Sequence, residues 1–254
     1  MVRAIINGCN GRMGQTLVNA IEASEDFEVA AGVDPFGKSP ADWDFTTYAS
    51  LSEVKETADV VIDFSNIDGL KDLCSQAIEK KLPMVIATTG ITEEHLDFMR
   101  DCGKKIAILQ AANMSLGINL LKVLVKQAAE VLQDSFDIEI VERHHRMKRD
   151  APSGTALALA DVINGNGKGK YEYINGRHEK NKLRTDAEIG IHAVRGGTIV
   201  GDHDVIFAGR DEVLQLSHRA YSRSLFATGA MKAAAFIVNK APGLYHMEDL
   251  FSQS

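Results

Sequence analysis

The chain has 254 residues, of which 45% are apolar and 25% are charged, and its net charge is −7. These values are ordinary for a soluble globular protein of one large or two modest domains, and the acidic balance argues against a nucleic-acid surface. We find no apolar run near the roughly 18 residues of a membrane span, no signal-peptide pattern and no metal-ligand spacing among the three cysteines. We therefore expect a cytoplasmic protein with no membrane or nucleic-acid partner and no metal site.

In the first part of the chain, apolar strand-like runs alternate with helical patterns. We expect strands at 2–7, 27–33, 59–64, 84–88 and 106–110, and helices at 11–23, 51–57, 68–80 and 93–103. Short apolar strands separated by helices are typical of βαβ units and predict a doubly wound parallel sheet. Ligands of such sheets bind at the carboxyl ends of the strands.

The second part of the chain has a different pattern. We expect helices at 115–132 and 153–163, strands at 137–143, 188–195, 198–208 and 212–218, and a polar loop at 164–170. Gly196-Gly197 is predicted to be the hairpin turn that joins the strands 188–195 and 198–208. This pattern predicts an α+β domain with an open mixed sheet. An alanine-rich helix at 222–238 is expected to pack back onto the first domain.

The turn after the first strand carries a glycine motif, NGCNGRMG at 7–14. Gly11 and Gly14 occupy the last two positions of G-x-G-x-x-G, while Cys9 stands at the first position and Gly8 precedes it. In a Rossmann-type fold these glycines allow a tight turn, close approach of a pyrophosphate and close packing of helix on strand. Asp34 ends the next strand, where a carboxylate can accept hydrogen bonds from the adenosine ribose. The loops 63–65 and 87–90 end at the same rim, so we predict a dinucleotide site there.

A basic cluster precedes a helix start in ERHHRMKRDAPSGTA, residues 142–156. Ser153 suits an N-cap, and Gly154 lets a ligand approach the backbone. The first turn of a helix offers unpaired N–H groups and a positive dipole end, which suit a carboxylate or phosphate. A basic run is more often a solvated face, and paired histidines are more often structural. Beside a helix start and a dinucleotide motif, however, these residues predict a site that binds an acid and moves a proton.

Through these motifs the chain resembles the 4-hydroxy-tetrahydrodipicolinate reductases (dihydrodipicolinate reductases) of the diaminopimelate route to lysine. The resemblance covers nearly the whole chain and rests on motifs at 8–14, 63–65, 87–90, 111–119, 142–156 and 194–203. It implies hydride transfer from NADH or NADPH to a small dicarboxylate, 4-hydroxy-tetrahydrodipicolinate, giving tetrahydrodipicolinate. It also implies a homotetramer assembled through the open sheet. The expected domains are a dinucleotide-binding domain at 1–115 and 222–254 and a substrate-binding and oligomerisation domain at 116–221.

The resemblance also implies a set of site residues. His144 is expected to supply the proton, assisted by Lys148, while His145, Gly154 and Thr155 hold a substrate carboxylate. The implied cofactor contacts are Gly8, Cys9, Asn10, Gly11, Arg12, Met13, Asp34, Ala87, Thr88, Thr89, Ala111, Ala112, Asn113 and Met114. The roles of Arg143, Arg146 and Arg149 stay open between substrate steering and surface charge. Arg195 and His203 are expected to fix loops near the site.

Two departures from the family pattern bear on the cofactor. Ala87 stands where many relatives have glycine, which crowds the backbone slightly. Pro35 follows Asp34, where some relatives place an arginine that meets the 2′-phosphate of NADPH. A carboxylate repels that phosphate, so we expect NADH to be favoured, although Arg12 and Lys38 could offset the repulsion and members of the family often accept both cofactors.

Two alternative functions are consistent with parts of the sequence. The first is another two-domain NAD(P)-dependent dehydrogenase of a small carboxylic or amino acid, which should lack the substrate motif at 142–156. The second is a non-catalytic regulator that senses the dinucleotide, which would need a DNA-reading element or a partner surface. We find no basic helix-turn-helix pattern in the sequence.

Overall fold

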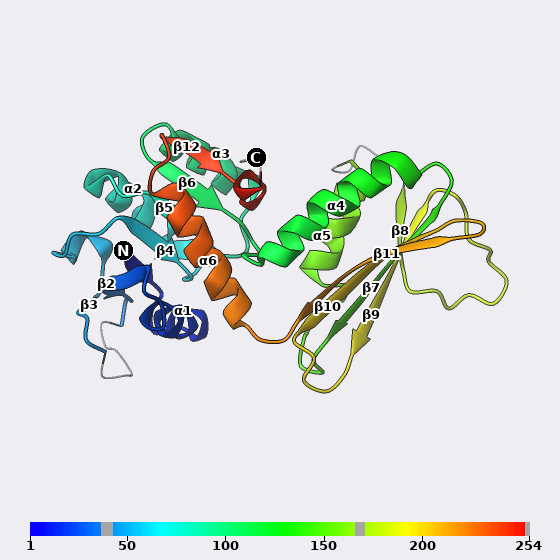
Figure 1. The fold of residues 1–254 in the computed structure, drawn as a ribbon, viewed down its shortest axis with the longest axis horizontal. Helices are drawn as coiled ribbons and strands as arrows, with labels where there is room; N and C mark the ends of the chain where they lie inside the picture. The colour runs from blue at the N-terminus through cyan, green and yellow to red at the C-terminus, as the bar shows by residue number, and fades with distance from the viewer. Residues whose placement is uncertain (37–42, 166–170, 252–254) are drawn as a thin grey trace. The chain divides into compact units, whose positions relative to one another are not determined.

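The computed structural model describes residues 1–36, 43–165 and 171–251, and it divides the chain into two compact units (Figure 1). One unit comprises Met1–Leu116 and Arg223–Ser254, and the other comprises Gly117–Ser222. Within the described residues, no helix combines the length and the apolar character needed to cross a bilayer.

The first unit contains a seven-stranded parallel sheet with the order β12-β6-β5-β4-β1-β2-β3. Its strands are β1 (Val2–Asn7), β2 (Phe27–Val33), β3 (Thr47–Tyr48), β4 (Val60–Asp63), β5 (Met84–Ile86), β6 (Ala107–Gln110) and β12 (Gly243–Tyr245). Its α-helices are α1 (Arg12–Glu22), α2 (Leu70–Lys80), α3 (Glu93–Gly103) and α6 (Ser224–Ile237), and short 3₁₀ helices lie at Leu51–Glu53, Ile67–Gly69 and Met247–Leu250. The predicted doubly wound parallel sheet is confirmed. The two short edge strands β3 and β12 were not predicted.

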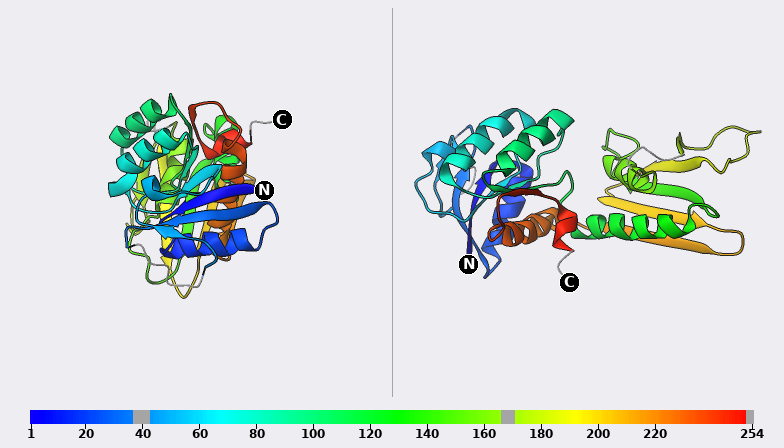
Figure 2. Two further views of the ribbon diagram at one scale, coloured as in Figure 1. Left: turned by 90° about the vertical axis from the view of Figure 1, so that its left-hand side faces the viewer. Right: turned by 90° about the horizontal axis from the view of Figure 1, so that it is seen from above.

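Both faces of this sheet are covered, because alternate strand residues point into two separate cores. Ala4 and Ile6 pack with α1 and α6, whereas Ile5 packs with α2 and α3. Figure 2 shows the teal helices α2 and α3 on the opposite side of the strands from the orange helix α6. Ala227, Ala230, Ala233 and Ala234 of α6 lie fully buried in the same core as α1, so the predicted return of the last helix onto the first part of the chain is confirmed.

The second unit contains a mixed five-stranded sheet with the order β11-β10-β7-β9-β8. Its strands are β7 (Asp137–His144), β8 (Glu172–Asn175), β9 (Glu188–Arg195), β10 (Gly201–Ala208) and β11 (Val213–Ala220). Helices α4 (Leu116–Leu132) and α5 (Gly154–Ile163) supply apolar side chains to the core that also contains the inward residues of β7, β9 and β10. Strand β8 was not predicted, and most of the expected loop at 164–170 lies outside the described residues.

The predicted hairpin at Gly196-Gly197 is wrong. Gly197 does adopt a positive φ of 49°, but β9 and β10 do not pair with each other. Strand β7 lies between them, parallel to β9 and antiparallel to β10. The connecting loop passes over the end of β7, where Gly196 N donates to His144 O at 2.9 Å and Arg146 N donates to Gly197 O at 3.2 Å. The glycine pair therefore closes over the predicted substrate motif.

Candidate functional site

The glycine turn between β1 and α1 leaves no room for side chains at two positions. Gly8 has a φ of 78°, and a Cβ added there would lie 2.9 Å from the Phe64 carbonyl oxygen. A Cβ at Gly14 would lie 2.2 Å from the Gly8 carbonyl oxygen. Gly11 is the N-cap of α1, so the first N–H groups of this helix follow directly on the turn. The turn has the shape that a phosphate-binding turn requires.

A buried carboxylate ties the loops of this rim together. Asp63, at the end of β4, is completely buried. Its Oδ1 accepts hydrogen bonds from Asn7 Nδ2 at 2.7 Å and from Ser65 Oγ at 2.6 Å, and its Oδ2 accepts one from Thr88 Oγ1 at 2.6 Å. Asp63 thus fixes the ends of β1 and β4 and the loop after β5 relative to one another.

A cleft of about 450 Å³ opens beside the glycine turn. It is lined by Gly8 and Gly11, by Asp34 and Pro35 at the end of β2, and by residues of the loops after β3 and β4 and of helix α2. Asp34 is 7% exposed, and its Oδ1 accepts a hydrogen bond from Phe36 N at 3.2 Å. The cleft therefore extends from the N-terminus of α1 to the carboxylate of Asp34. A helix N-terminus suits the phosphates of an adenosine diphosphate moiety, and a carboxylate suits its ribose hydroxyls.

The other predicted cofactor residues differ in how far they are exposed to solvent. Cys9 and Met114 are buried, and burial together with the charge of Asp34 raises the pKa of the Cys9 thiol to about 11. Only the backbone of Cys9 is therefore suited to contact a ligand. The exposed residues are Arg12, Thr89 and Ala112; Asn10, Met13, Ala111 and Asn113 are half-buried, and Ala87 and Thr88 are buried. Lys38 lies outside the described residues.

In the second unit, the end of β7 holds a buried cluster of charged and titratable side chains. His144 is the last residue of the strand and is 8% exposed. Its Nδ1 lies 2.6 Å from Oε2 of Glu142, which is fully buried. Arg195, at the end of β9, donates from Nη1 to Oε2 and from Nη2 to Oε1 of the same carboxylate, each at 2.7 Å. Burial alone would raise the pKa of Glu142, but the hydrogen bonds from Arg195 and His144 bring it below its usual value.

The N-terminus of α5 adjoins this cluster. Ser153 is the N-cap, as predicted, and its Oγ accepts a hydrogen bond from Ala156 N at 3.1 Å. The Ser153 N–H donates to Glu142 Oε1 at 3.0 Å. A Cβ added to Gly154 would meet no atom of residues 1–36, 43–165 or 171–251 within 4 Å, so the space beside the first turn is open with respect to these residues. The predicted residues Gly154 and Thr155 thus form an accessible helix start next to His144.

The basic residues of the motif have different surroundings. Lys148 Nζ lies 2.8 Å from Asp150 Oδ2, and the lysine side chain is 22% exposed. Arg143 points to the other face of the sheet, where its Nη1 pairs with Asp204 Oδ2 at 2.5 Å. Arg146 and Arg149 are exposed, and His145 is half-buried.

Two imidazoles in this cluster favour the neutral form. Burial lowers the pKa of His144 below its ordinary value; the hydrogen bond and charge of Glu142 oppose this effect, while Lys148 and Arg195 add to it. Burial and the nearby His144 lower the pKa of His203, on β10, to about 3. The His203 Nε2 lies 3.0 Å from Ser153 Oγ, and its Nδ1 has no hydrogen-bond partner among the described residues. A second N–H on this ring would therefore be buried without an acceptor.

The sequence reasoning did not assign roles to Glu142 and Asp63, although both lie in motifs that it singled out. The sequence did carry a signal for both residues, because each is a carboxylate at an inward position near the end of a strand. Such a position requires hydrogen-bond partners.

Comparisons with known proteins cover nearly the whole chain. Family models described as "Dihydrodipicolinate reductase, N-terminus" and "Dihydrodipicolinate reductase, C-terminus" match residues 2–114 and 117–251. The chain is 56% identical over 250 residues to a 4-hydroxy-tetrahydrodipicolinate reductase of Caldanaerobacter subterraneus subsp. tengcongensis, with 98% of each chain covered. It is 48% identical over 248 residues to a protein of the same name from Clostridium tetani, covering 98% of this chain and 96% of the relative.

The solved structures agree with this result. A dipicolinate-bound dihydrodipicolinate reductase from Paenisporosarcina sp. TG-14 matches with a TM-score of 0.82 and 26% identity over 97% of both chains. A DAP dehydrogenase of C. glutamicum matches with a TM-score of 0.61 at 12% identity, over all of this chain and 96% of that one, which is a likeness of fold alone.

Proposed function

The chain belongs to the dihydrodipicolinate reductase family, and on that premise we propose that it reduces 4-hydroxy-tetrahydrodipicolinate to tetrahydrodipicolinate with NADH or NADPH. The observation that carries the proposal is the cluster at the end of β7. There a titratable imidazole, the ammonium of Lys148 and an open helix N-terminus lie together, as proton donation to a bound dicarboxylate requires. The fold and the family matches along the chain support the same activity.

The first unit would hold the cofactor. The turn from Gly8 to Gly14 and the N-terminus of α1 suit the pyrophosphate, since no Cβ fits at Gly8 or Gly14 and no side chain of the described residues caps the N-terminus of the helix. The loops at Ala87–Thr89 and Ala111–Met114 follow β5 and β6 and would contact the nicotinamide half. When bound, the reduced nicotinamide would supply a hydride to the substrate ring, and in the overall reaction the 4-hydroxyl group leaves as water.

The acidic end of the cleft favours NADH. Asp34 is buried and is followed by Pro35, and none of the described residues that line the cleft is lysine or arginine. A phosphate on the ribose would meet this carboxylate without a compensating cation at the cleft, and like charges at close range repel. Kinetics with NADH and NADPH side by side test the preference. A higher kcat/KM for NADPH would contradict it.

The second unit would hold the substrate. One carboxylate would accept hydrogen bonds from the N–H groups and the hydroxyl at Gly154 and Thr155, where the helix dipole also favours an anion. Lys148 and His145 would bind the polar groups on the other side of the ring. The ammonium also stabilises negative charge that develops on the ring during reduction.

His144 would deliver the proton. Its Nδ1 is engaged by Glu142, so Nε2 is the nitrogen available to a substrate. The imidazole favours the neutral form in the free protein, and the negative charge of a bound dicarboxylate favours the protonated form. Binding of the substrate would therefore favour protonation of His144, and His144 would then donate this proton to the substrate.

The open sheet of the second unit would form the tetramer. Along β7 the residues that face α4 and α5 are buried, while Glu139, Val141 and Arg143 on the opposite face are only partly covered. Light scattering tests this assignment. Four chains of 27.7 kDa are expected, and a monomer would refute it.

The test of function is the loss of NADH absorbance when freshly made substrate is added. Steady turnover with this substrate, inhibited by the analogue dipicolinate, is the expected result. Turnover only with another small carboxylic or amino acid would support the alternative dehydrogenase. NADH binding without turnover of any acid would support the regulator.

A further inference from the structure

The two carboxylate oxygens of Glu142 contact two different parts of the proposed substrate site, the ring of His144 and the N-terminus of α5. Oε2 meets Nδ1 of His144 at 2.6 Å, and Oε1 accepts the backbone N–H of Ser153 at 3.0 Å. The carboxylate is fully buried, and a buried charge is costly unless it is paired and hydrogen-bonded. If Glu142 served only to fill this space, an apolar side chain would be less costly to bury than this carboxylate.

Arg195 supplies the compensating charge. Its two terminal nitrogens bond one oxygen each of Glu142 at 2.7 Å, and Nη2 also donates to the Asp150 carbonyl at 2.6 Å. This two-point contact fixes the plane of the carboxylate as well as its position. Glu142 therefore joins β7, β9, the loop before α5 and the N-cap of α5.

We propose that Glu142, held by Arg195, is the positioning residue that sets His144 and the N-terminus of α5 in one arrangement. The inference rests on the proposed function of these two elements. An ionised carboxylate only accepts hydrogen bonds, so Nδ1 of His144 must carry a hydrogen and Nε2 is left for the substrate. The same carboxylate anchors the helix start that holds the substrate carboxylate, so the distance between the two groups is fixed.

The remaining charged and titratable groups around His144 come from three other segments. Lys148 lies in the loop after β7, Arg195 ends β9, and His203 on β10 packs edge-on against the His144 ring, with 5.2 Å between centroids. Among these neighbours Glu142 is the one that both bonds the ring and attracts its protonated form. Loss of its charge should therefore change the tautomer of His144 and lower its affinity for a proton.

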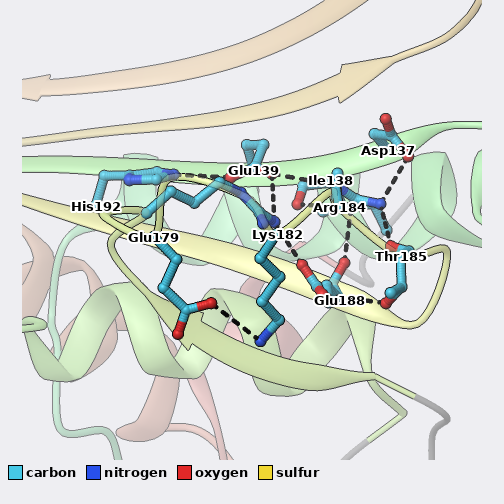
Figure 3. Close-up of polar contacts among 10 residues, drawn as sticks. Asp137, Ile138, Glu139, Glu179, Lys182, Arg184, Thr185, Glu188 and His192 are labelled. Carbon is cyan, nitrogen blue, oxygen red and sulfur yellow. Dashed lines mark hydrogen bonds and ion pairs between the residues drawn. The ribbon is translucent and has the colours of Figure 1, made fainter.

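A matched control lies on the same strand. Glu139 precedes Glu142 by three residues and belongs to the opposite face of the sheet. Its carboxylate also accepts hydrogen bonds from an imidazole, His192 Nε2 at 2.7 Å, and from a guanidinium, Arg184 Nε at 3.2 Å (Figure 3). Glu139→Gln and Glu142→Gln thus remove the same charge from similar networks, but only the second network adjoins the substrate site.

The experiment compares both variants with the unmodified protein by steady-state kinetics, by dipicolinate titration and by ¹⁵N NMR of the histidine rings. For Glu142→Gln we expect kcat to fall about 100-fold, as misplacement of a catalytic group commonly causes. We also expect weaker dipicolinate binding, an acid shift of the pH profile and loss of the Nδ1–H tautomer of His144. Glu139 lies on the proposed tetramer face, so light scattering first checks that Glu139→Gln has the same oligomeric state as the unmodified protein; this variant should then leave all four unchanged. Unchanged kcat and tautomer in Glu142→Gln, or equal losses in both variants, would overturn the proposal.

A second variant covers the case in which Glu142→Gln does not fold, which circular dichroism would reveal. Arg195→Lys keeps the charge but cannot bond both carboxylate oxygens in a fork. A smaller fall in kcat with a changed His144 ring signal is expected, and an unaffected enzyme would overturn the proposal. The NMR signal also separates this inference from the proposed function. Absence of reductase activity would refute the function alone, whereas an Nε2–H tautomer in the unmodified protein would refute the role of Glu142 alone.

Discussion

The buried imidazole of His203 should make the second unit sensitive to acid. The ring is 4% exposed, its Nε2 contacts Ser153 Oγ, and within the part of the chain that the structure describes its Nδ1 has no hydrogen-bond partner. Burial and the nearby His144 lower its pKa from 6.5 to about 3. The unfolded chain therefore binds a proton at this histidine below pH 6.5, while the folded protein binds it only near pH 3. Since the unfolded state takes up the extra proton, the free energy of unfolding falls as the pH falls through this window.

The size of the effect follows from the two pKa values. One unit of pKa shift corresponds to about 1.4 kcal/mol, so between pH 7 and pH 4 this single histidine should remove about 3 kcal/mol from the free energy of unfolding. Such a loss is a large fraction of the stability of an ordinary domain. Glutamine in place of His203 retains an amide group near the position of Nε2 but does not titrate.

Urea unfolding at a fixed protein concentration between pH 7 and pH 4 measures the effect. Circular dichroism is the suitable signal, because the single tryptophan, Trp43, lies in the first unit. We expect the stability of the unmodified protein to fall more steeply with acid than that of His203→Gln, by about 3 kcal/mol over the range. Titrating carboxylates act equally in both proteins and cancel in the difference. Parallel curves for the two proteins would refute the assignment of a buried neutral imidazole.

Three further predictions concern the proposed sites. His144→Gln and Lys148→Ala should each lower kcat and leave the Kd for NADH unchanged in a fluorescence titration, since both residues belong to the second unit; lost NADH binding would contradict the division into two half-sites. Asp34→Asn should raise the NADPH-to-NADH ratio of kcat/KM about 10-fold by removing about 1.4 kcal/mol of repulsion, and an unchanged ratio would exclude contact with the ribose. Gly14→Ala should destabilise the protein by about 1–3 kcal/mol in thermal unfolding, because its Cβ would lie 2.2 Å from a backbone oxygen, whereas Gly154→Ala should keep its Tm and raise only the KM for substrate.

Local patterns were sufficient for most of the fold. The buried parallel strands of the first unit are continuous apolar runs, and the glycine turn is specified by backbone geometry within a few residues, so both could be predicted. The edge strands β3 and β12 have two and three residues, too few to give a periodic signal. The N-cap of α5 was predicted because capping depends on one side chain and the turn that follows it.

The strand order of the second unit and the centre of the site could not be obtained in this way, for one physical reason. A glycine pair between two strands favours a hairpin locally, but β7 pairs with β10 along one edge and with β9 along the other. In this position its inward residues Ile138 and Ile140 are buried in the core with those of β9 and β10. The same insertion brings Arg195 beside Glu142, which is 53 residues away in the chain. A carboxylate on β7 and a guanidinium on β9 become partners only once the register Glu142↔Ala193 is set. The ion pair of Glu142 and Arg195, which positions the proposed proton donor His144, thus depends on the strand order. A prediction that pairs β9 with β10 cannot place these two side chains together.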